Sequence, residues 1–169
     1  KIAGVRVHTP NGRSFDLHSP GYYFLATDTP GVLRWLARRA SDHGATVRFG
    51  ERIDALRRTD DRWSIDPPGI SSKWVLGADG AQSSVARMTG LGTNRRFLVG
   101  VEAEFTGVGG IDPDVLHVFI DSELAPGYIA WVVPGVEGAQ VGLARNADRA
   151  PDLEGLLALL ARRFDFSKA

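Results

Sequence analysis

The sequence contains no cysteine among its 169 residues, which excludes disulfides, thiolate nucleophiles and cysteine-ligated metals. It also lacks net charge, because 20 basic residues balance 20 acidic ones, and so has no basic field of the kind that attracts nucleic acid. No apolar stretch approaches the roughly 18–20 residues that span a bilayer, and no signal peptide is visible. These absences predict a cytoplasmic protein without a transmembrane segment or a nucleic-acid partner, and leave peripheral membrane contact open.

Several catalytic signatures are missing as well. There is no Gly-x-Ser-x-Gly motif and no phosphate-cradling lysine motif, so hydrolase and nucleotide-triphosphatase functions have no support. The four histidines show no metal-ligand spacing; we expect His8 and His18 at solvent or in a turn, and His117 as a structural residue of a strand. No pair of acidic residues has the spacing of a calcium loop. The sequence therefore predicts no metal site, and it identifies no catalytic residue.

A strand–turn–helix pattern organises the middle of the chain. The apolar run 74–76 predicts a buried strand, which Asp79 and Gly80 end in a tight turn. Ser83 and Ser84 are N-cap candidates for a helix that follows. A carboxylate at the strand end and free N–H groups at the helix start would suit a nucleotide. An ordinary strand–helix turn would have the same spacing.

The elements before this pattern mix hairpins with one helix. Alternating segments predict a hairpin over 2–17, and the aromatic run 22–25 is expected in the core. Thr29 is expected to cap a helix that ends at Gly44. Further strands are predicted over 45–49, 63–65 and 73–77; since the first of these follows a helix directly, we expect it to be parallel to a strand outside the chain.

The second half changes to short alternating strands. They are predicted over 97–105, 115–120, 128–133 and 139–144, and short Gly-Pro-Asp turns between them favour an antiparallel meander. A helix is expected from Asp152 to about Phe164. The overall prediction is an α+β fold, with part of an α/β domain over 1–92 and an antiparallel sheet domain with a C-terminal helix over 93–169.

The run from Gly77 to Arg87, Gly-Ala-Asp-Gly-Ala-Gln-Ser-Ser-Val-Ala-Arg, resembles the Asp-Gly motif of FAD-dependent monooxygenases and reductases of the aromatic-hydroxylase type. Its Val-Ala-Arg ending is most similar to the geranylgeranyl reductase branch. In that family the motif lies beside the flavin, and the redox chemistry is the flavin's own. The resemblance thus implies FAD, an electron donor such as NAD(P)H, and cofactor-binding roles for Gly77, Asp79, Gly80, Ser83 and Arg87.

A second motif lies between Pro126 and Pro134 and resembles the Pro-x-x-Tyr-x-Trp-x-Phe-Pro motif of geranylgeranyl reductases. Trp131 matches, as do both prolines, whereas Ile129 stands at the family's tyrosine position with Tyr128 one step earlier. In the family this motif lines the cavity for an isoprenoid chain. The resemblance implies a small apolar substrate bound by Tyr128, Ile129, Trp131 and Pro134, although Tyr128 is expected to point away because strand neighbours face opposite sides.

The resemblance covers the middle of the family's length. The N-terminal Gly-x-Gly-x-x-Gly turn that seats a dinucleotide diphosphate is not present, and Thr29 stands where the family commonly has an arginine that contacts that diphosphate. We therefore expect a fragment of an FAD-dependent oxidoreductase, reducing C=C bonds of a prenyl or other apolar substrate, inactive alone and prone to self-association through exposed sheet edges. The alternatives are a flavin-dependent aromatic hydroxylase or halogenase, and a non-catalytic module that binds an apolar ligand without flavin.

Overall fold

The computed structural model describes all 169 residues, and they form two compact units. The first, called the sheet unit, combines Lys1–Val32 with Leu98–Ala169; the second, called the middle unit, is Leu33–Phe97. This division differs from the predicted boundary between residues 92 and 93, because the first 32 residues join the sheet of the second half rather than the segment that follows them.

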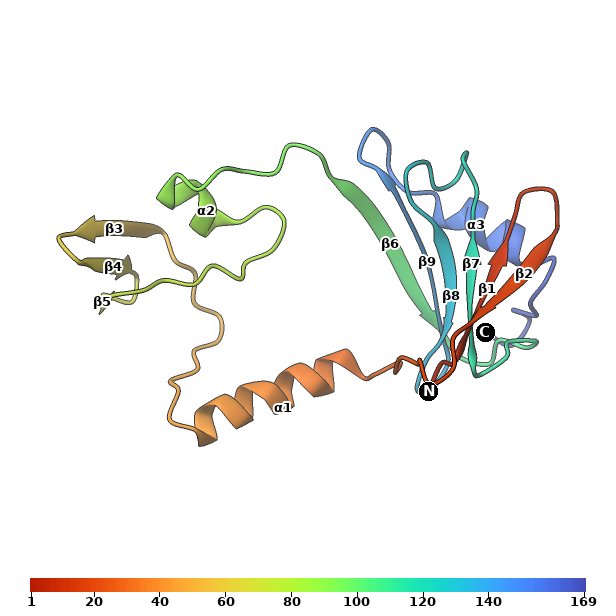
Figure 1. The fold of residues 1–169 in the computed structure, drawn as a ribbon, viewed down its shortest axis with the longest axis horizontal. Helices are drawn as coiled ribbons and strands as arrows, with labels where there is room; N and C mark the ends of the chain where they lie inside the picture. The colour runs from red at the N-terminus through yellow and green to blue at the C-terminus, as the bar shows by residue number, and fades with distance from the viewer. The chain divides into compact units, whose positions relative to one another are not determined.

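The sheet unit is built on one six-stranded sheet with the order β2-β1-β7-β8-β9-β6 (Figure 1). Only the β1–β7 pair is parallel. The predicted hairpin and the four predicted later strands are confirmed. The predicted antiparallel meander forms over β7, β8 and β9, but it does not include β6 as expected: β6 pairs with β9, and β7 pairs with β1 on its other side. The strands are β1 (Gly4–His8), β2 (Ser14–His18), β6 (Leu98–Phe105), β7 (Val115–Phe119), β8 (Ala130–Pro134) and β9 (Ala139–Asn146).

One face of this sheet forms the core with helix α3 (Leu153–Leu160). The helix begins where predicted, since Asp152 accepts a hydrogen bond from the Gly155 N–H at 2.8 Å. Leu156 and Leu160 are completely buried. They pack with the strand residues that share their side of the sheet, Phe119, Ala130, Val132, Val141 and Leu143.

Two histidines also lie on the helix side of the sheet. His8 on β1 and His117 on β7 are only 5% and 4% exposed, so the expectation that His8 faces solvent is wrong. His117 is buried in a strand as expected. The parallel β1–β7 pairing is the cause of the difference, because it covers a strand that would otherwise be half of an exposed hairpin.

The middle unit contains a three-stranded antiparallel sheet and a short helix. Its strands are β3 (Ala55–Thr59), β4 (Arg62–Asp66) and β5 (Ile70–Ser72), and its helix is α2 (Ser84–Thr89). Helix α1 (Thr29–Asp42) leads into it. Its cap is Asp28 rather than Thr29, since the Gly31 N–H donates to Asp28 Oδ1 at 3.0 Å. None of the three helices is long and apolar enough to cross a membrane.

Two predicted strands do not form, and a predicted core segment is exposed. The segments 45–49 and 73–77 adopt no strand, and Phe49, Trp74 and Leu76 are 79%, 87% and 94% exposed. A strand is stabilised by hydrogen bonds to a neighbouring strand, and no segment of this chain pairs with either one. The aromatic run 22–25 is also mostly exposed, with only a bridge between Phe24 and Ile2. The apolar stripe of α1 likewise contains no buried residue.

We expect the substitution Leu160→Ala to lower the free energy of unfolding of the sheet unit by about 2–5 kcal/mol, because it leaves a cavity in a fully buried core. Urea unfolding measures this change. Val136→Ala, at a position 69% exposed, is the control and should change the free energy by less than about 0.5 kcal/mol. Equal effects of the two substitutions would contradict the assignment of α3 to the core.

Candidate functional site

The Asp79 loop closes on itself through the carboxylate of Asp79. Its Oδ1 accepts a hydrogen bond from the Ser83 hydroxyl at 2.5 Å, and its Oδ2 accepts from the N–H groups of Ser84 at 2.6 Å and Val85 at 3.1 Å. Ser83 is the N-cap of α2, and its Oγ accepts from the Ala86 N–H at 3.0 Å. The first three N–H groups of α2 are therefore all occupied. The expectation of free N–H groups at this helix start is wrong.

These hydrogen bonds have an electrostatic consequence. They lower the pKa of Asp79 below its usual value, with the Ser83 hydroxyl as the largest cause and the Val85 N–H next. Two glycines allow the loop to close. A Cβ at Gly77 would lie 2.8 Å from Cγ1 of Val85, and Gly80 has a φ of 81° with nothing within 4 Å of its missing side chain. Gly80 thus leaves the backbone of the turn open.

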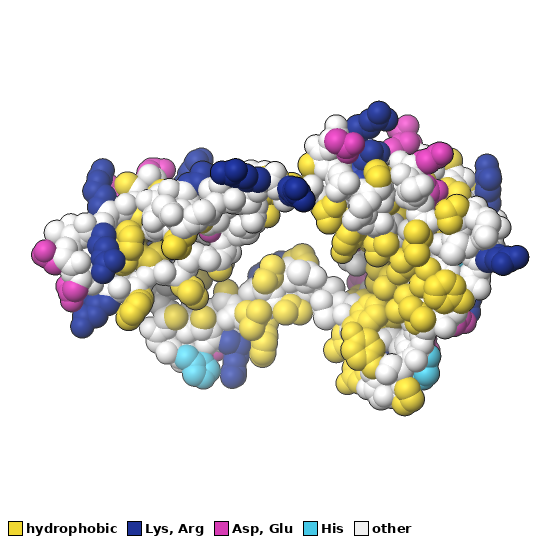
Figure 2. Space-filling model, turned by 45° about the horizontal axis from the view of Figure 1, so that its top comes forward, with side chains coloured by type: hydrophobic (Ala, Val, Ile, Leu, Met, Phe, Trp, Pro, Cys, Tyr) yellow, Lys and Arg dark blue, Asp and Glu magenta, His cyan; other side chains and the backbone are white.

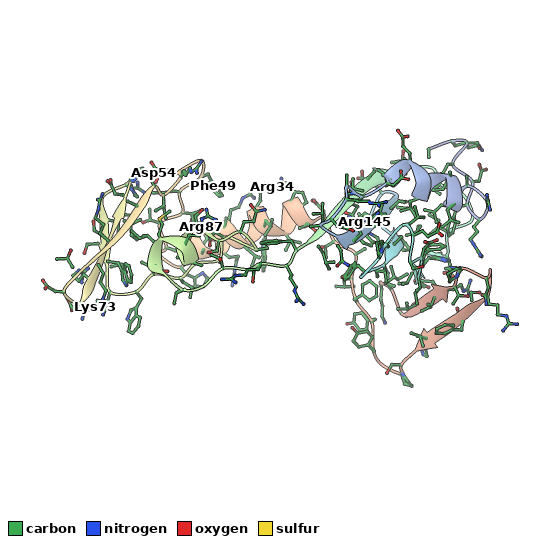
Figure 3. The ribbon with its side chains drawn as sticks, turned by 90° about the horizontal axis from the view of Figure 1, so that it is seen from above. Arg34, Phe49, Asp54, Lys73, Arg87 and Arg145 are labelled. Carbon is green, nitrogen blue, oxygen red and sulfur yellow. The ribbon has the colours of Figure 1, made fainter.

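Arg87 lies on α2 (Figure 3), and its side chain contacts the same loop through two hydrogen bonds. Its guanidinium donates to the Gln82 carbonyl at 2.6 Å and to Ser84 Oγ at 2.7 Å. Asn94, which the sequence did not single out, donates to the Ala81 carbonyl at 2.9 Å. A cavity of about 320 Å³ lies beside the loop. The wall of this cavity includes Ala81, Gln82, Ser83, Arg87, Asn94 and Phe97. The structure therefore gathers the five residues predicted to bind a cofactor at one stiff turn beside the cavity.

The second predicted motif places Trp131 on the side of the sheet opposite α3. One register row on that side crosses all six strands, and we call it the outer row: Phe15, Val7, Val118, Trp131, Gly142 and Glu102. The indole N–H of Trp131 donates to Glu102 Oε2 at 2.8 Å. The ring lies over Gly142, where a Cβ would be 2.7 Å from Trp131 Cζ2. Glu102 and Gly142 therefore set the ring's position, and sequence reasoning missed both because they lie on other strands.

The four predicted substrate residues do not share one face. Ile129 lies just before β8, and its carbonyl accepts a hydrogen bond from the Ala144 N–H at 3.1 Å. Pro134 is buried on the α3 side, in register with Ala139. Tyr128 was expected to point away from Trp131, yet its ring packs edge-on against that indole with centroids 6.5 Å apart. Tyr128 is half exposed and contacts Trp131, so it lies at the solvent-exposed edge of the outer row.

Thr29 lines a cavity of about 670 Å³ in the sheet unit, with no residue of either predicted motif in its wall. The cavity lies between residues 26–30 and the β8–β9 turn. The same wall contains the carboxylates of Asp28, Glu104 and Glu137. Asp28 Oδ1 is used as the cap of α1. No basic side chain lines this cavity, so it repels anions. Nowhere in the structure do three histidine or acidic side chains converge as metal ligands would.

The chain is similar to proteins named as digeranylgeranylglycerophospholipid reductases. It is 32% identical over 164 residues to the digeranylgeranylglycerophospholipid reductase of Methanocaldococcus jannaschii, covering 92% of this chain and 42% of that protein. It is 30% identical over 161 residues to the protein of the same name from Methanosarcina acetivorans, covering 88% of this chain and 40% of that protein. The chain matches no protein-family model.

A solved structure agrees on the fold. A geranylgeranyl bacteriochlorophyll reductase-like protein from Thermoplasma acidophilum superimposes with a TM-score of 0.74 at 20% identity, over 96% of this chain and 44% of that one. The resemblance inferred from the two motifs is thus confirmed, as is the α+β fold class. The chain spans about two fifths of the length of the curated relatives it matches.

We expect the backbone amide signals of Ser84 and Val85 to titrate with Asp79. The carboxylate's hydrogen bonds are fully present above its usual pKa and are lost only as the pH falls through its lowered folded-state value. An NMR titration from about pH 6 to about pH 2 should therefore give a midpoint below that of an ordinary aspartate. Asp79→Asn is the control and should abolish the transition. A midpoint at or above the usual value would contradict the capping role.

We expect Gly142→Ala to displace the indole of Trp131, since the new methyl group would meet both that ring and the Val101 carbonyl at 2.7 Å. The variant should lose about 1–3 kcal/mol of unfolding free energy and shift the NMR signal of the Trp131 indole N–H. Gly4→Ala is a matched strand control, with only an ordinary contact to Val115 at 3.7 Å. An unchanged indole signal in Gly142→Ala would show that the ring does not depend on this glycine.

Proposed function

We propose that the protein is an FAD-dependent reductase that reduces C=C bonds of a prenyl or similarly apolar substrate. The similarity to the two archaeal reductases supports this, because it extends over nearly all of the chain and includes both motifs. The observation that carries the proposal is the outer row. It is apolar from Phe15 to Trp131 and becomes polar only at Glu102, the acceptor that holds the indole.

The outer row suits an apolar chain for a simple physical reason. Phe15 and its strand neighbour Leu17 are 51% and 52% exposed, and Trp131 is partly exposed, whereas Val7 and Val118 of the same row are only 6% and 9% exposed. An apolar ligand that contacts Phe15, Leu17 and Trp131 would remove their apolar surface from water. Figure 2 shows hydrophobic side chains gathered on the sheet unit. Trp131 adds a flat ring that Glu102 prevents from rotating. An isoprenoid chain, with no polar group along its length, needs contacts of this kind and few hydrogen bonds.

The Asp79 loop fits one part of FAD and not another. The open backbone at Gly80, beside a small cavity and stiffened by Asp79 and Arg87, fits a turn that lies against a planar ring. The occupied N–H groups of α2 do not fit the diphosphate, and neither does the acidic cavity around Thr29. A bound FAD would supply the electrons for the reduction. This chain's Gly77, Asp79, Gly80, Ser83 and Arg87 would shape the loop against it.

The roles of the two parts follow from this division. We propose that residues up to about 92 contribute mainly to cofactor binding, apart from strands β1 and β2, and that residues 93–169 contribute mainly to substrate binding through Trp131, Ile129 and Tyr128. Pro134 would act from the core by fixing the end of β8. NAD(P)H is the proposed electron donor. A cytoplasmic location stays a prediction.

The rival functions predict different ligands. A flavin-dependent hydroxylase or halogenase would share the Asp79 loop but bind an aromatic substrate at the outer row, and the similarity to named reductases does not favour it. A non-catalytic module would bind an apolar ligand and no flavin, and Thr29 in its acidic cavity is the feature in its favour. Direct measurement of flavin in the full-length gene product distinguishes these.

We expect the absorbance spectrum of the purified full-length protein to show flavin bands in the blue that bleach on addition of NADPH or NADH, and we expect turnover of a geranylgeranyl substrate. Trp131→Ala and Glu102→Ala should lower kcat/KM roughly tenfold to hundredfold, since the first removes an apolar contact and the second frees the ring.

Glu102→Gln is the matched control, because its amide oxygen still accepts the indole hydrogen bond and activity should be kept. A colourless protein that takes up no FAD would support the module instead. A yellow protein that hydroxylates an aromatic compound and leaves prenyl double bonds intact would support the hydroxylase.

A further inference from the structure

The sheet unit contains a second cavity, of about 340 Å³, on the side of the sheet that α3 covers. It lies where the β1–β2 turn, the end of β7 and the chain after α3 come together. Its walls include His8, Phe119, Asp121, Leu159, Arg162 and Arg163. His8 and Phe119 are register partners facing α3, whereas Trp131 faces the other side, so the cavity is separate from the outer row. Its volume is in the range of small-molecule sites, roughly 300–1,000 Å³.

Two arginines, Arg162 and Arg163, line this cavity as exposed residues, and their guanidinium groups have no partner. Neither Arg162 nor Arg163 takes part in any of the ion pairs or side-chain hydrogen bonds of the chain. Asp121 is the only acidic group in the wall, and its Oδ1 already accepts from the N–H groups of Glu123 at 2.8 Å and Leu124 at 2.9 Å. The cavity therefore has two formal positive charges against one negative charge.

The end of α3 does not account for these arginines. Cations are favoured near a helix C-terminus because its last carbonyls lack partners. Here the carbonyls of Leu157, Leu159 and Leu160 already accept hydrogen bonds from the backbone N–H groups of residues 161–164. Neither guanidinium group donates to a carbonyl of the helix, so both remain available to a ligand.

One wall residue, His8, is paired with the buried His117, which does not itself line the cavity. His8 Nε2 and His117 Nδ1 are 3.0 Å apart, so one donates to the other. The His8 ring stacks on Phe119 at 4.4 Å, and the His117 ring meets the edge of Phe164 at 5.1 Å. The outer nitrogens, His8 Nδ1 and His117 Nε2, have no partner. In the neutral pair only one of these two outer nitrogens carries a proton, so the pair has two tautomeric arrangements that a nearby charge can bias.

Burial and the surrounding charges lower the pKa values of both histidines. Burial, followed by Arg163, lowers the pKa of His8 to about 4, while His117 and Arg6 add to this effect and Asp16 opposes it. Burial and then Arg6 lower the pKa of His117, with Asp112 and Asp16 opposing and Arg163 adding. Both rings are neutral near pH 7. An anion beside Arg163 would offset the positive field at His8 and stabilise a proton on that ring.

We propose that this cavity binds a phosphate-type oxyanion through Arg162 and Arg163, and that the His8–His117 pair responds to it through His8, the member of the pair that lines the cavity. Paired guanidinium groups match the several oxygens of a phosphate with charge-assisted hydrogen bonds. The cavity is larger than a bare phosphate, and Phe119 and Leu159 give it an apolar side for an organic group esterified to that phosphate. The site does not depend on the proposed reductase function.

The first experiment is calorimetric titration of the full-length protein with inorganic phosphate at pH 7. Arg162→Gln and Arg163→Gln should each weaken binding about tenfold or more, as expected for loss of a charge-assisted hydrogen bond. Arg149→Gln, an exposed arginine of the same unit that lines no such cavity, is the matched control and should bind phosphate like the wild type. Equal affinity in all four proteins, or no phosphate binding together with no arginine-dependent vesicle binding, would overturn the proposal.

Two further measurements complete the test. Sedimentation with phosphatidylglycerol vesicles, against phosphatidylcholine vesicles, distinguishes the sources of the phosphate: a lipid headgroup gives binding that depends on both arginines and that free phosphate displaces, and a soluble phosphate compound gives none. The ¹⁵N signals of His8 and His117 should shift on phosphate addition in the wild type and not in the double Arg162→Gln, Arg163→Gln variant. The same signals, observed without phosphate, show whether that variant is folded.

Discussion

The parallel pairing of β1 with β7 is the contact on which the rest of the sheet unit depends. It joins residues near the start of the chain to a strand more than a hundred positions later, in a register that matches Val7 with Val118 and His8 with Phe119. The match of Val7 with Val118 extends the outer row to Phe15. The match of His8 with Phe119 places His8 within hydrogen-bond distance of His117, which lies two positions before Phe119 on the same strand. Without this pair the apolar face would be two strands narrower, and the arginine-lined cavity would lose the β1–β2 turn from its wall.

Strand alternation then separates two kinds of surface within the same sheet. Side chains on one side of β8 and β9 pack on α3, and those on the other side hold Trp131 over Gly142. Glu102 reaches the indole from the edge strand β6, so the position of the aromatic ring depends on three strands at once. An apolar ligand and a charged one are therefore proposed on opposite sides of the sheet, and neither proposal needs the other.

The Asp79 loop shows a different arrangement, in which a short motif satisfies its own polar groups. Asp79 and Ser83 occupy the N–H groups that would otherwise attract a phosphate, and Arg87 fastens the loop carbonyls. What stays exposed is the backbone around Gly80, because its left-handed conformation carries no side chain. This arrangement favours a loop shaped for contact with a flat ligand over one that binds a diphosphate.

Local patterns were sufficient for the hairpin over 2–17, the helix after Asp152, the strands of the second half and the tight turn at Asp79 and Gly80, because each depends on residues within a few positions of one another. The same reasoning failed at 45–49 and 73–77, where a strand needs a partner that no local pattern supplies. It also failed for His8, Glu102 and Gly142. The contacts of His8 with His117 and of Glu102 with Trp131 join residues 109 and 29 positions apart. Composition and periodicity thus determined the turns, the helices and those strands that find a partner within the chain. The order and register of the strands, which depend on long-range hydrogen bonding, decided which predicted strands form and which side chains meet.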